Sequence, residues 1–196
     1  TVIAVARDGR AIGVLGVTDP LKPDSAAAIK ELRRLGLPAV MLTGDNRRTA
    51  AAIGSEVGVE RVEAELLPDQ KSAAIRRLQD DGRRVAMVGD GINDAPALTQ
   101  ADVGLAIGTG TDIAIEAAGI TLVRGNLGAV TSAVRLARRT FRVIRQNLFW
   151  AFFYNVVAIP LAVAGLLHPV IAEVCMALSS LTVVGNALRL RSYDPT

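Results

Sequence analysis

The sequence predicts an α/β domain with a doubly wound parallel sheet, followed by a hairpin of two apolar helices that crosses a membrane. Up to residue 125, short β-rich runs alternate with segments of helical period, which is the pattern of βαβ units. Residues 1–147 carry 20 of the 22 Lys and Arg residues and 17 of the 19 Asp and Glu residues. Residues 148–188 carry a single charge, Glu173, so a polar domain precedes an apolar tail.

The composition excludes two classes of protein. One cysteine allows no intrachain disulfide framework and fits a reducing compartment. The net charge of +3 does not indicate nucleic-acid binding, because much of the basic excess lies beside the apolar tail. Thr1 already lies in a strand-like run, so we expect the chain to begin within a longer protein.

The α/β region begins with a hairpin, because apolar runs at 2–6 and 12–17 flank the turn Arg7-Asp8-Gly9-Arg10. Asp19-Pro20-Leu21-Lys22-Pro23 then reads as a hinge. Asp24 or Ser25 can cap the next helix, with Ile29, Leu32 and Leu35 on its core face and Gly36 at its end. We then expect strands at 37–42, 61–64, 84–88, 103–107 and 119–123, and helices at 46–57, from Pro68 to Gly82, at 94–100 and at 112–117.

The tail combines a basic helix with two apolar spans. Arginines at 135, 138, 139, 142 and 145 recur with helical period, and so do apolar residues from Val134 to Leu148. Residues 148–167 and 170–188 are each long enough to cross a bilayer of about 30 Å. Arginine at both outer ends, and none in the loop, places both ends in the cytoplasm. A buried pair of core helices is the alternative, and this charge pattern disfavours it.

A phosphate and metal site is predicted where the apolar run Val85–Val88 enters Gly89-Asp90-Gly91-Ile92-Asn93-Asp94. Loops at the carboxyl ends of parallel strands form the crevice in which ligands bind. Two carboxylates in one short loop suit Mg²⁺, which is usually held by carboxylates, waters and a substrate phosphate. The alternative is an acidic turn that only solvates the end of a strand.

Two more polar groups fall at this predicted crevice. Thr43-Gly44-Asp45 follows the strand at 37–42, and Lys71 lies in the first turn of the helix after Pro68. Thr43 could donate to a phosphate oxygen, Lys71 could neutralise charge that develops in phosphoryl transfer, and Asp90 and Asp94 could anchor Mg²⁺. Thr43 could instead be a helix cap, and Lys71 a solvated surface cation.

These motifs, together with Pro68-Asp69-Gln70-Lys71, resemble the phosphorylation domain of P-type cation-transporting ATPases, a branch of the haloacid dehalogenase-like fold. The resemblance covers essentially the whole chain. It implies ATP and Mg²⁺ as cofactors and ATP hydrolysis coupled to cation transport. It implies catalytic roles for Thr43, Gly44, Asp45, Lys71, Asp90, Asn93 and Asp94, cofactor binding by Asp19, Thr43 and Lys71, and Mg²⁺ binding by Asp90 and Asp94.

The tail resembles the copper(I)-exporting branch of that family, because Tyr154-Asn155 lies in the first span and Met176, Ser179 and Ser180 lie in the second. Residues 176, 179 and 180 share one helix face, and a thioether suits Cu(I). Taken singly, each of these residues could serve only helix packing. Glu173, Val174, Cys175 and His168 depart from the family pattern and leave the metal selectivity open.

The same resemblance divides the chain and shows what it lacks. No Asp-Lys-Thr-Gly occurs, so the phosphorylated aspartate is absent, as are the nucleotide-binding domain, the actuator domain and the Cys-Pro-Cys helix. We therefore expect part of a heavy-metal exporter of the plasma (inner) membrane, in contact with lipid and with the remainder of the pump. Alternatives are an inert membrane-anchored fragment or regulatory partner, and a membrane-tethered phosphatase. The expected segments are 1–22 (hairpin and hinge), 23–125 (phosphorylation domain), 126–147 (basic stalk helix), 148–188 (transmembrane hairpin) and 189–196 (cytoplasmic tail).

Overall fold

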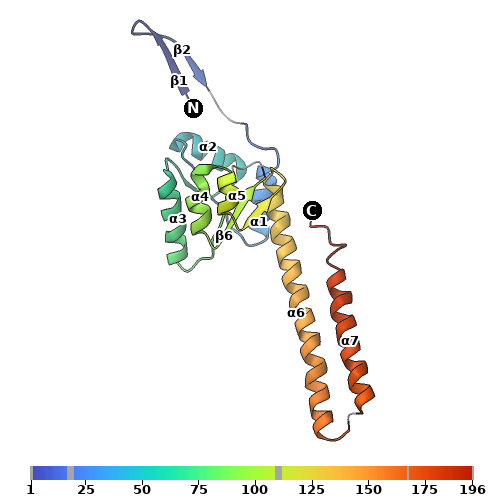
Figure 1. Cartoon of the computed structure of the whole chain (residues 1–196). Helices are drawn as coiled ribbons and strands as arrows, with labels where there is room; N and C mark the ends of the chain where they lie inside the picture. Colours follow the sequence, from blue (N-terminus) through green and yellow to red (C-terminus); the bar gives the residue numbers. More distant parts are fainter. Residues whose placement is uncertain (1, 17–19, 109–111, 167, 196) are drawn as a thin grey trace. The chain divides into compact units, whose positions relative to one another are not determined.

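The structure is a computed structural model that describes residues 2–16, 20–108, 112–166 and 168–195. The chain divides into two compact units, Thr1–Thr131 and Ser132–Thr196. The first holds every described strand, and the second holds most of two long helices (Figure 1).

The predicted hairpin is confirmed. Strands β1 (Val2–Arg7) and β2 (Arg10–Gly16) pair antiparallel, with Arg7 opposite Arg10. Their two-residue turn has φ of +50° at Asp8 and +77° at Gly9. Positive φ at both turn residues matches the twist of the strands, which is why Asp-Gly suits this position. Every residue of β2 is exposed, so the described chain covers neither face of this ribbon.

The α/β region follows the predicted alternation, and its helices end at the predicted glycines. Gly36, Gly58 and Gly82 all have positive φ. The predicted strand at 37–42 is shorter because Pro38, within it, has no N–H to donate to a ladder. In chain order the elements are α1 (Ser25–Arg34), β3 (Val40–Leu42), α2 (Arg47–Val57), β4 (Arg61–Glu63), α3 (Pro68–Asp80), β5 (Ala86–Gly89), the 3-10 helix η1 (Ile92–Asp94), α4 (Ala95–Gln100), β6 (Val103–Ile107), α5 (Asp112–Ala117) and β7 (Ile120–Leu122).

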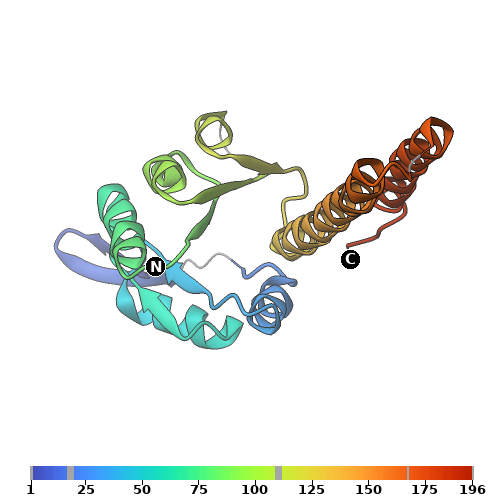
Figure 2. The ribbon, with the colours of Figure 1, turned by 90° about the horizontal axis from the view of Figure 1, so that it is seen from below.

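The strands are parallel as predicted, but they form two hydrogen-bonded groups. One group is β3–β4, and the other is β5–β6–β7. Among the described residues no strand pairs with the second edge of β3 or of β5, and Figure 2 shows the two groups as separate ribbons. Side chains bridge them, because Leu42 of β3 packs against the core cluster that contains Ile75 of α3 and Met87 of β5.

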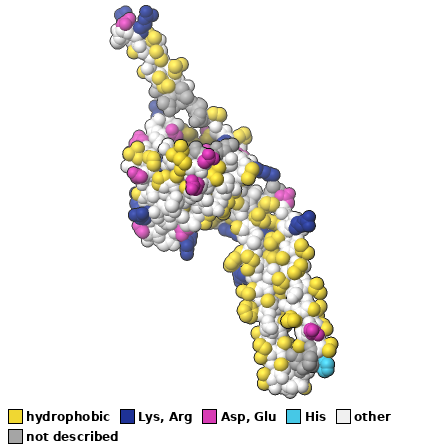
Figure 3. Space-filling model, viewed as in Figure 1, with side chains coloured by type: hydrophobic (Ala, Val, Ile, Leu, Met, Phe, Trp, Pro, Cys, Tyr) yellow, Lys and Arg dark blue, Asp and Glu magenta, His cyan; other side chains and the backbone are white. Residues whose placement is uncertain are grey.

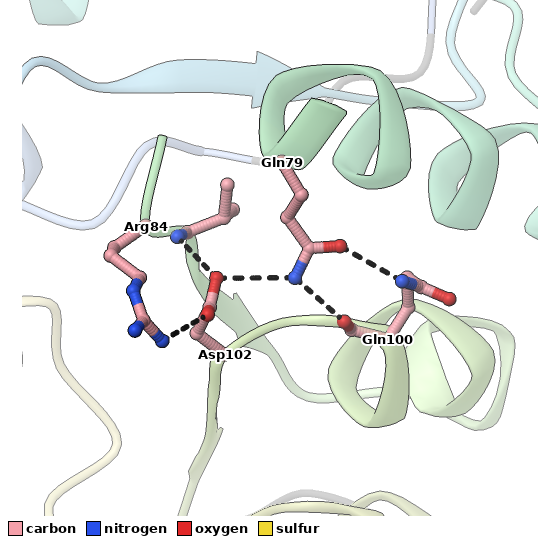
Figure 4. Close-up of polar contacts among 5 residues, drawn as sticks. Gln79, Arg84, Gln100 and Asp102 are labelled. Atoms are coloured by element: carbon pink, nitrogen blue, oxygen red, sulfur yellow. Dashed lines mark hydrogen bonds and ion pairs between the residues drawn. The ribbon is translucent and has the colours of Figure 1, made fainter. Parts of the chain in front are cut away.

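A polar network around Asp102 fixes the amino ends of β5 and β6 (Figure 4). The Asp102 carboxylate accepts hydrogen bonds from Val85 N at 2.9 Å, Gln79 Nε2 at 3.1 Å and Arg84 Nη1 at 2.9 Å. The Val85 amide first, then Gln79 and Arg84, lower the pKa of Asp102 from 3.8 to about 2. Gln79 also exchanges hydrogen bonds with Gln100. Because the Val85 amide bonds a side chain, β5 begins at Ala86 rather than at the predicted residue 84.

The start of the first long helix, α6 (Gly128–Val163), is tied to the segment after the hinge. The Asp24 carboxylate accepts from Gly128 N at 2.8 Å, and Lys22 Nζ donates to Gly125 O at 2.7 Å. Asp24 is the N-cap residue of α1 but makes no side-chain cap there. One of the two predicted cap residues thus holds the N-cap position, but its carboxylate satisfies an orphan N–H of α6 rather than one of α1.

The second unit is built from α6 and α7 (Pro169–Leu188). The predicted basic helix and first span form one continuous helix, which ends at Val163, short of the predicted residue 167. Asn186 Nδ2 of α7 donates to Asn147 Oδ1 of α6 at 2.8 Å, so an amide pair joins the two helices. Both helices are long and apolar enough to cross a membrane. Hydrophobic side chains cover much of their surface (Figure 3).

Candidate functional site

The centre of the site is an ion pair between Lys71 and Asp94. Lys71 Nζ lies 2.8 Å from Asp94 Oδ1, and the two side chains are only 15% and 14% exposed. Pro68 begins α3, and Gln70 Oε1 accepts from Leu67 N, so the first turn that carries Lys71 is well fixed. This pair brings together two residues that the sequence places 23 positions apart. Lys71 is therefore not a solvated surface cation in this structure.

Gly89 explains why Asp94 can lie against the end of β5. A Cβ built on Gly89 would stand 2.7 Å from Asp94 Cβ and 2.9 Å from Asp94 Oδ2. Any side chain at position 89 would therefore push Asp94 away from its place. The sequence singled out the glycine as part of a turn, but this close approach was not predicted.

Asp90 and Asn93 lie at the surface of the same loop. Both residues are exposed, whereas Gly89 is buried and Asp94 is partly buried. No hydrogen bond or ion pair within the described residues occupies the Asp90 carboxylate. The loop therefore presents one carboxylate that is paired with a lysine and one that is open to a ligand.

The Thr43 loop is ordered by its own hydrogen bonds. Thr43 Oγ1 donates to Asp45 Oδ2 at 2.9 Å and accepts from Asp45 N at 3.1 Å. The N-cap of α2 is Asn46, whose side chain accepts from Thr49 N at 2.9 Å. Thr43 is therefore not the cap of that helix, which removes the structural alternative considered from sequence. Its hydroxyl can exchange Asp45 for a phosphate oxygen, because a hydroxyl is both donor and acceptor.

Backbone contacts place the Thr43 loop against the segment that leads into α3. Leu66 N donates to Thr43 O at 3.0 Å, and Glu65 N donates to Asp45 O at 2.8 Å. A Cβ on Gly44 would lie 3.4 Å from Leu66 O, so Gly44 faces the same segment. Glu65 and Leu66 are residues that the sequence did not single out. Glu65 has φ of +58°, a left-handed conformation that costs a non-glycine residue energy.

These contacts connect the predicted site from end to end. The Thr43 loop meets the residues just before α3, the first turn of α3 carries Lys71, and Lys71 pairs with Asp94. Among described residues no hydrogen bond joins Thr43 to Lys71 or Asp94, and Asp19 lies outside the described residues. Asp90 and Asp94 supply carboxylate oxygens of the kind that Mg²⁺ prefers. In the part of the chain that is described, no group of three or more His, Cys, Asp or Glu side chains forms a metal site.

The predicted residues of the two spans divide between inner and outer faces of the hairpin. Tyr154 and Ser179 are half-buried, whereas Met176 is 69% exposed and Asn155 and Ser180 are exposed. Asn155 Nδ2 donates to Ala151 O at 2.8 Å, and Ser180 Oγ donates to Met176 O at 3.2 Å. The two polar side chains satisfy their donors on their own helices. The convergence of Tyr154, Asn155, Met176 and Ser179 on one point stays a prediction.

Comparisons with known proteins bear on both parts of the chain. Residues 1–102 match the family described as haloacid dehalogenase-like hydrolase. The chain is 58% identical over 193 residues to the probable copper-exporting P-type ATPase V of Mycobacterium tuberculosis, which covers 98% of this chain and 25% of that protein. It is 56% identical over 191 residues to the copper-exporting P-type ATPase of Bacillus subtilis, covering 97% of this chain and 24% of that protein. The chain thus spans about a quarter of the length of these relatives.

A solved structure supports the same relationship. The crystal structure of a zinc-transporting PIB-type ATPase in the E2.Pi state matches 96% of this chain and 31% of that chain. The TM-score is 0.87 and the sequence identity is 40%. The match includes the α/β part and the long helices, since it extends over nearly all residues.

Proposed function

Since this chain belongs to the haloacid dehalogenase-like hydrolases and resembles heavy-metal P-type ATPases along nearly its whole length, we propose that it is the C-terminal portion of an ATP-driven heavy-metal exporter. The observation that carries the proposal is the Lys71–Asp94 pair beside the open carboxylate of Asp90. A cation next to two carboxylates at the end of a parallel strand suits a phosphoryl group and its metal ion.

Each residue of the site has a distinct task in this proposal. Lys71 offers an ammonium group to the oxygens of a phosphoryl group, on which negative charge develops during transfer. Thr43 donates a hydrogen bond to the same group once its hydroxyl turns from Asp45. Asp90 and Asp94 hold Mg²⁺, which supplies positive charge to the phosphoryl oxygens when it is bound. Gly44, Asp45 and Asn93 shape the two loops. Asp19, in the hinge segment of the sequence, takes part in binding ATP.

The fit of Mg²⁺ to these residues rests on the exposed Asp90 carboxylate. An unpartnered carboxylate in a loop retains its lone pairs for a ligand, whereas Asp94 already shares one oxygen with Lys71. A divalent ion at Asp90 also offsets the negative charge that the loop would otherwise present to a phosphate.

The cargo in this proposal is Cu(I). The relatives from M. tuberculosis and B. subtilis are named a probable copper-exporting and a copper-exporting ATPase, and Met176 offers the soft sulfur that Cu(I) prefers. The zinc-transporting neighbour at 40% identity makes Zn²⁺ the competing cargo. Tyr154, Asn155, Ser179 and Ser180 would join Met176 around the ion when the remaining helices of the pump are present.

The proposed pump lies in the inner membrane, with the phosphorylation domain and both ends of the hairpin in the cytoplasm. The arginines that precede Leu148, together with Arg189 and Arg191, favour this orientation. The partners are the nucleotide-binding and actuator domains and the Cys-Pro-Cys helix, which the longer relatives have room to encode. Among the described strands none pairs with the outer edge of β3 or of β5, which supports a larger domain because a further strand could pair with both.

The proposal is tested by joining this chain to the remaining three quarters of the B. subtilis relative. The chimera should form a hydroxylamine-sensitive phosphoenzyme from ATP and hydrolyse ATP faster with Cu(I). Lys71→Met should suppress both activities, and Arg76→Met, a cation on the exposed face of the same helix, should suppress neither. A chimera that inserts into membranes but forms no phosphoenzyme would favour the inert or regulatory alternative.

A further inference from the structure

Two grooves on α6 share the lining residues Arg145 and Phe149. The first is lined by Arg138, Phe141, Arg142, Arg145, Gln146, Phe149 and Trp150, and has a volume of about 480 Å³. The second, also about 480 Å³, is lined by Arg145 and by five hydrophobic side chains: Leu148, Phe149, Phe152, Phe153 and Val156. All these residues belong to the second unit. One continuous surface therefore passes from guanidinium groups to aromatic and aliphatic side chains over about five helical turns, from Arg138 to Val156.

Two arginines of the charged groove, Arg142 and Arg145, lie on a helix that carries no acidic residue. The whole of α6 contains no Asp or Glu residue. Arg142 and Arg145 are exposed, and neither meets a carboxylate among the described residues. They stand three positions apart, so their guanidinium groups project from the same side of the helix. Guanidinium forks bind phosphate oxygens in a bidentate manner, which makes a phosphate group a matching ligand.

The apolar groove indicates that the bound phosphate belongs to a molecule that also has an apolar part. Phe149 is 60% exposed and Phe152 is 61% exposed, although they begin the stretch that is long and apolar enough to cross a membrane. The rings of Phe149 and Trp150 pack edge to face with their centroids 5.4 Å apart, so aromatic side chains form the surface at the start of the span. A soluble phosphate would fill the charged groove and leave these aromatic side chains uncovered. A phospholipid would cover both.

We propose that this surface of α6 binds an anionic phospholipid, with the headgroup phosphate on Arg142 and Arg145 and an acyl chain along Phe149, Phe152 and Val156. The inference rests on the membrane placement of the hairpin proposed above. Charge and hydropathy change at the same point of the helix, between Arg145 and Leu148. A lipid changes from charged to apolar over the same short length.

The single tryptophan, Trp150, lies in the charged groove and reports directly on bound lipid. The full chain is incorporated into phosphatidylcholine vesicles that contain a small fraction of phosphatidylglycerol. In one series the phosphatidylglycerol carries brominated acyl chains, and in the other an equal fraction of phosphatidylcholine does. Bromine quenches tryptophan fluorescence at short range, so the ratio of the two quenching constants measures the preference of the groove for the anionic lipid.

We expect stronger quenching by the anionic lipid, and Arg142→Gln with Arg145→Gln should lower this preference by roughly fivefold or more, since each surface arginine contributes about that factor at an anionic membrane. The control, Arg189→Gln with Arg191→Gln, removes the same charge at the other end of the hairpin and should retain the preference. Equal quenching by both lipids, or an unchanged preference in the first variant, would overturn the proposal. Competition by soluble glycerol phosphate would also overturn it, because the site would then be a plain anion site. If neither lipid quenches Trp150, the membrane placement itself fails together with this inference.

Discussion

Replacing Gly89 with alanine should displace Asp94 and destabilise the site, because the new Cβ would clash with the Asp94 side chain. Two carbon atoms in contact normally stand about 3.5–4.0 Å apart. The new Cβ would lie 2.7 Å from Asp94 Cβ, so the Asp94 side chain must retreat by roughly 1 Å. The Lys71–Asp94 distance is now 2.8 Å. A retreat of that size takes the pair out of hydrogen-bond range.

The expected cost is about 1–3 kcal/mol, the usual penalty for overpacking a well-filled site. At about 3 °C per kcal/mol for a domain of this size, the melting temperature should fall by roughly 3–9 °C. Scanning calorimetry of the full chain in detergent micelles would measure it. The matched control is Gly91→Ala, because a Cβ on Gly91 meets its nearest neighbour at an ordinary 3.9 Å and its φ is −116°.

A second substitution separates this clash from other effects of a methyl group at position 89. The nearest clashing atom is Asp94 Cβ, so Asp94→Gly should relieve most of the cost of Gly89→Ala, whereas Asp94→Ala should not. A double-mutant cycle would measure that difference. The close approach of Asp94 to β5 does not determine the site if Gly89→Ala has the same melting temperature as the parent. The same conclusion follows if Gly91→Ala lowers the melting temperature as much as Gly89→Ala does.

Three further changes test other parts of the molecule. The pKa of Asp102 is about 2 in the fold and 3.8 when unperturbed, so its carboxylate stabilises the fold above pH 4 and that stability is lost as the pH falls toward 2. The melting temperature of Asp102→Asn should therefore lie below that of the parent at pH 7, and the gap should close between pH 4 and pH 2. Mg²⁺ with a phosphate mimic should stabilise the chain, by about 1.4 kcal/mol at ten times the dissociation constant, and Asp90→Asn should abolish the gain in melting temperature. In the chimeric pump, Met176→Leu should weaken Cu(I)-stimulated ATP turnover without loss of expression, and stronger activation of the parent by Zn²⁺ would refute the copper assignment.

Much of the local structure could be predicted because the signals are local. Asp8-Gly9 determines a hairpin turn, Gly58 ends α2 in the left-handed region, and Pro68 begins α3. Each depends on the backbone preference of one or two residues. The strand at 103–107 and the helix at 112–117 were predicted with their observed bounds, since periodicity and flanking residues agree there.

What could not be predicted depends on distant partners. Asp24, one of two residues expected to cap the adjacent helix, holds its N-cap position, but its carboxylate bonds to Gly128, which is 104 residues away. The Val85 amide is diverted to Asp102, and this shortens β5 at its start. Nothing in the local pattern at either residue distinguishes these partners from solvent. Of the candidate site, the sequence identified Lys71 and Asp94 as members but not that they pair with each other.

The division of the sheet explains why a ligand should bind this chain only modestly. Thr43 follows β3 and Asp90 follows β5, and these strands belong to different hydrogen-bonded groups. In the described part of the chain no ladder fixes one loop against the other, so their relative position depends on the packing of Leu42 against the core and on the contacts before α3. Side-chain packing of this kind deforms more readily than a hydrogen-bonded sheet. The two halves of the site are therefore less well preorganised than they would be on one continuous sheet. Binding to a loosely held site costs ordering free energy. A strand that paired with both β3 and β5 would remove this cost, and the affinity for Mg²⁺ and phosphate should rise when the remainder of the proposed pump is present.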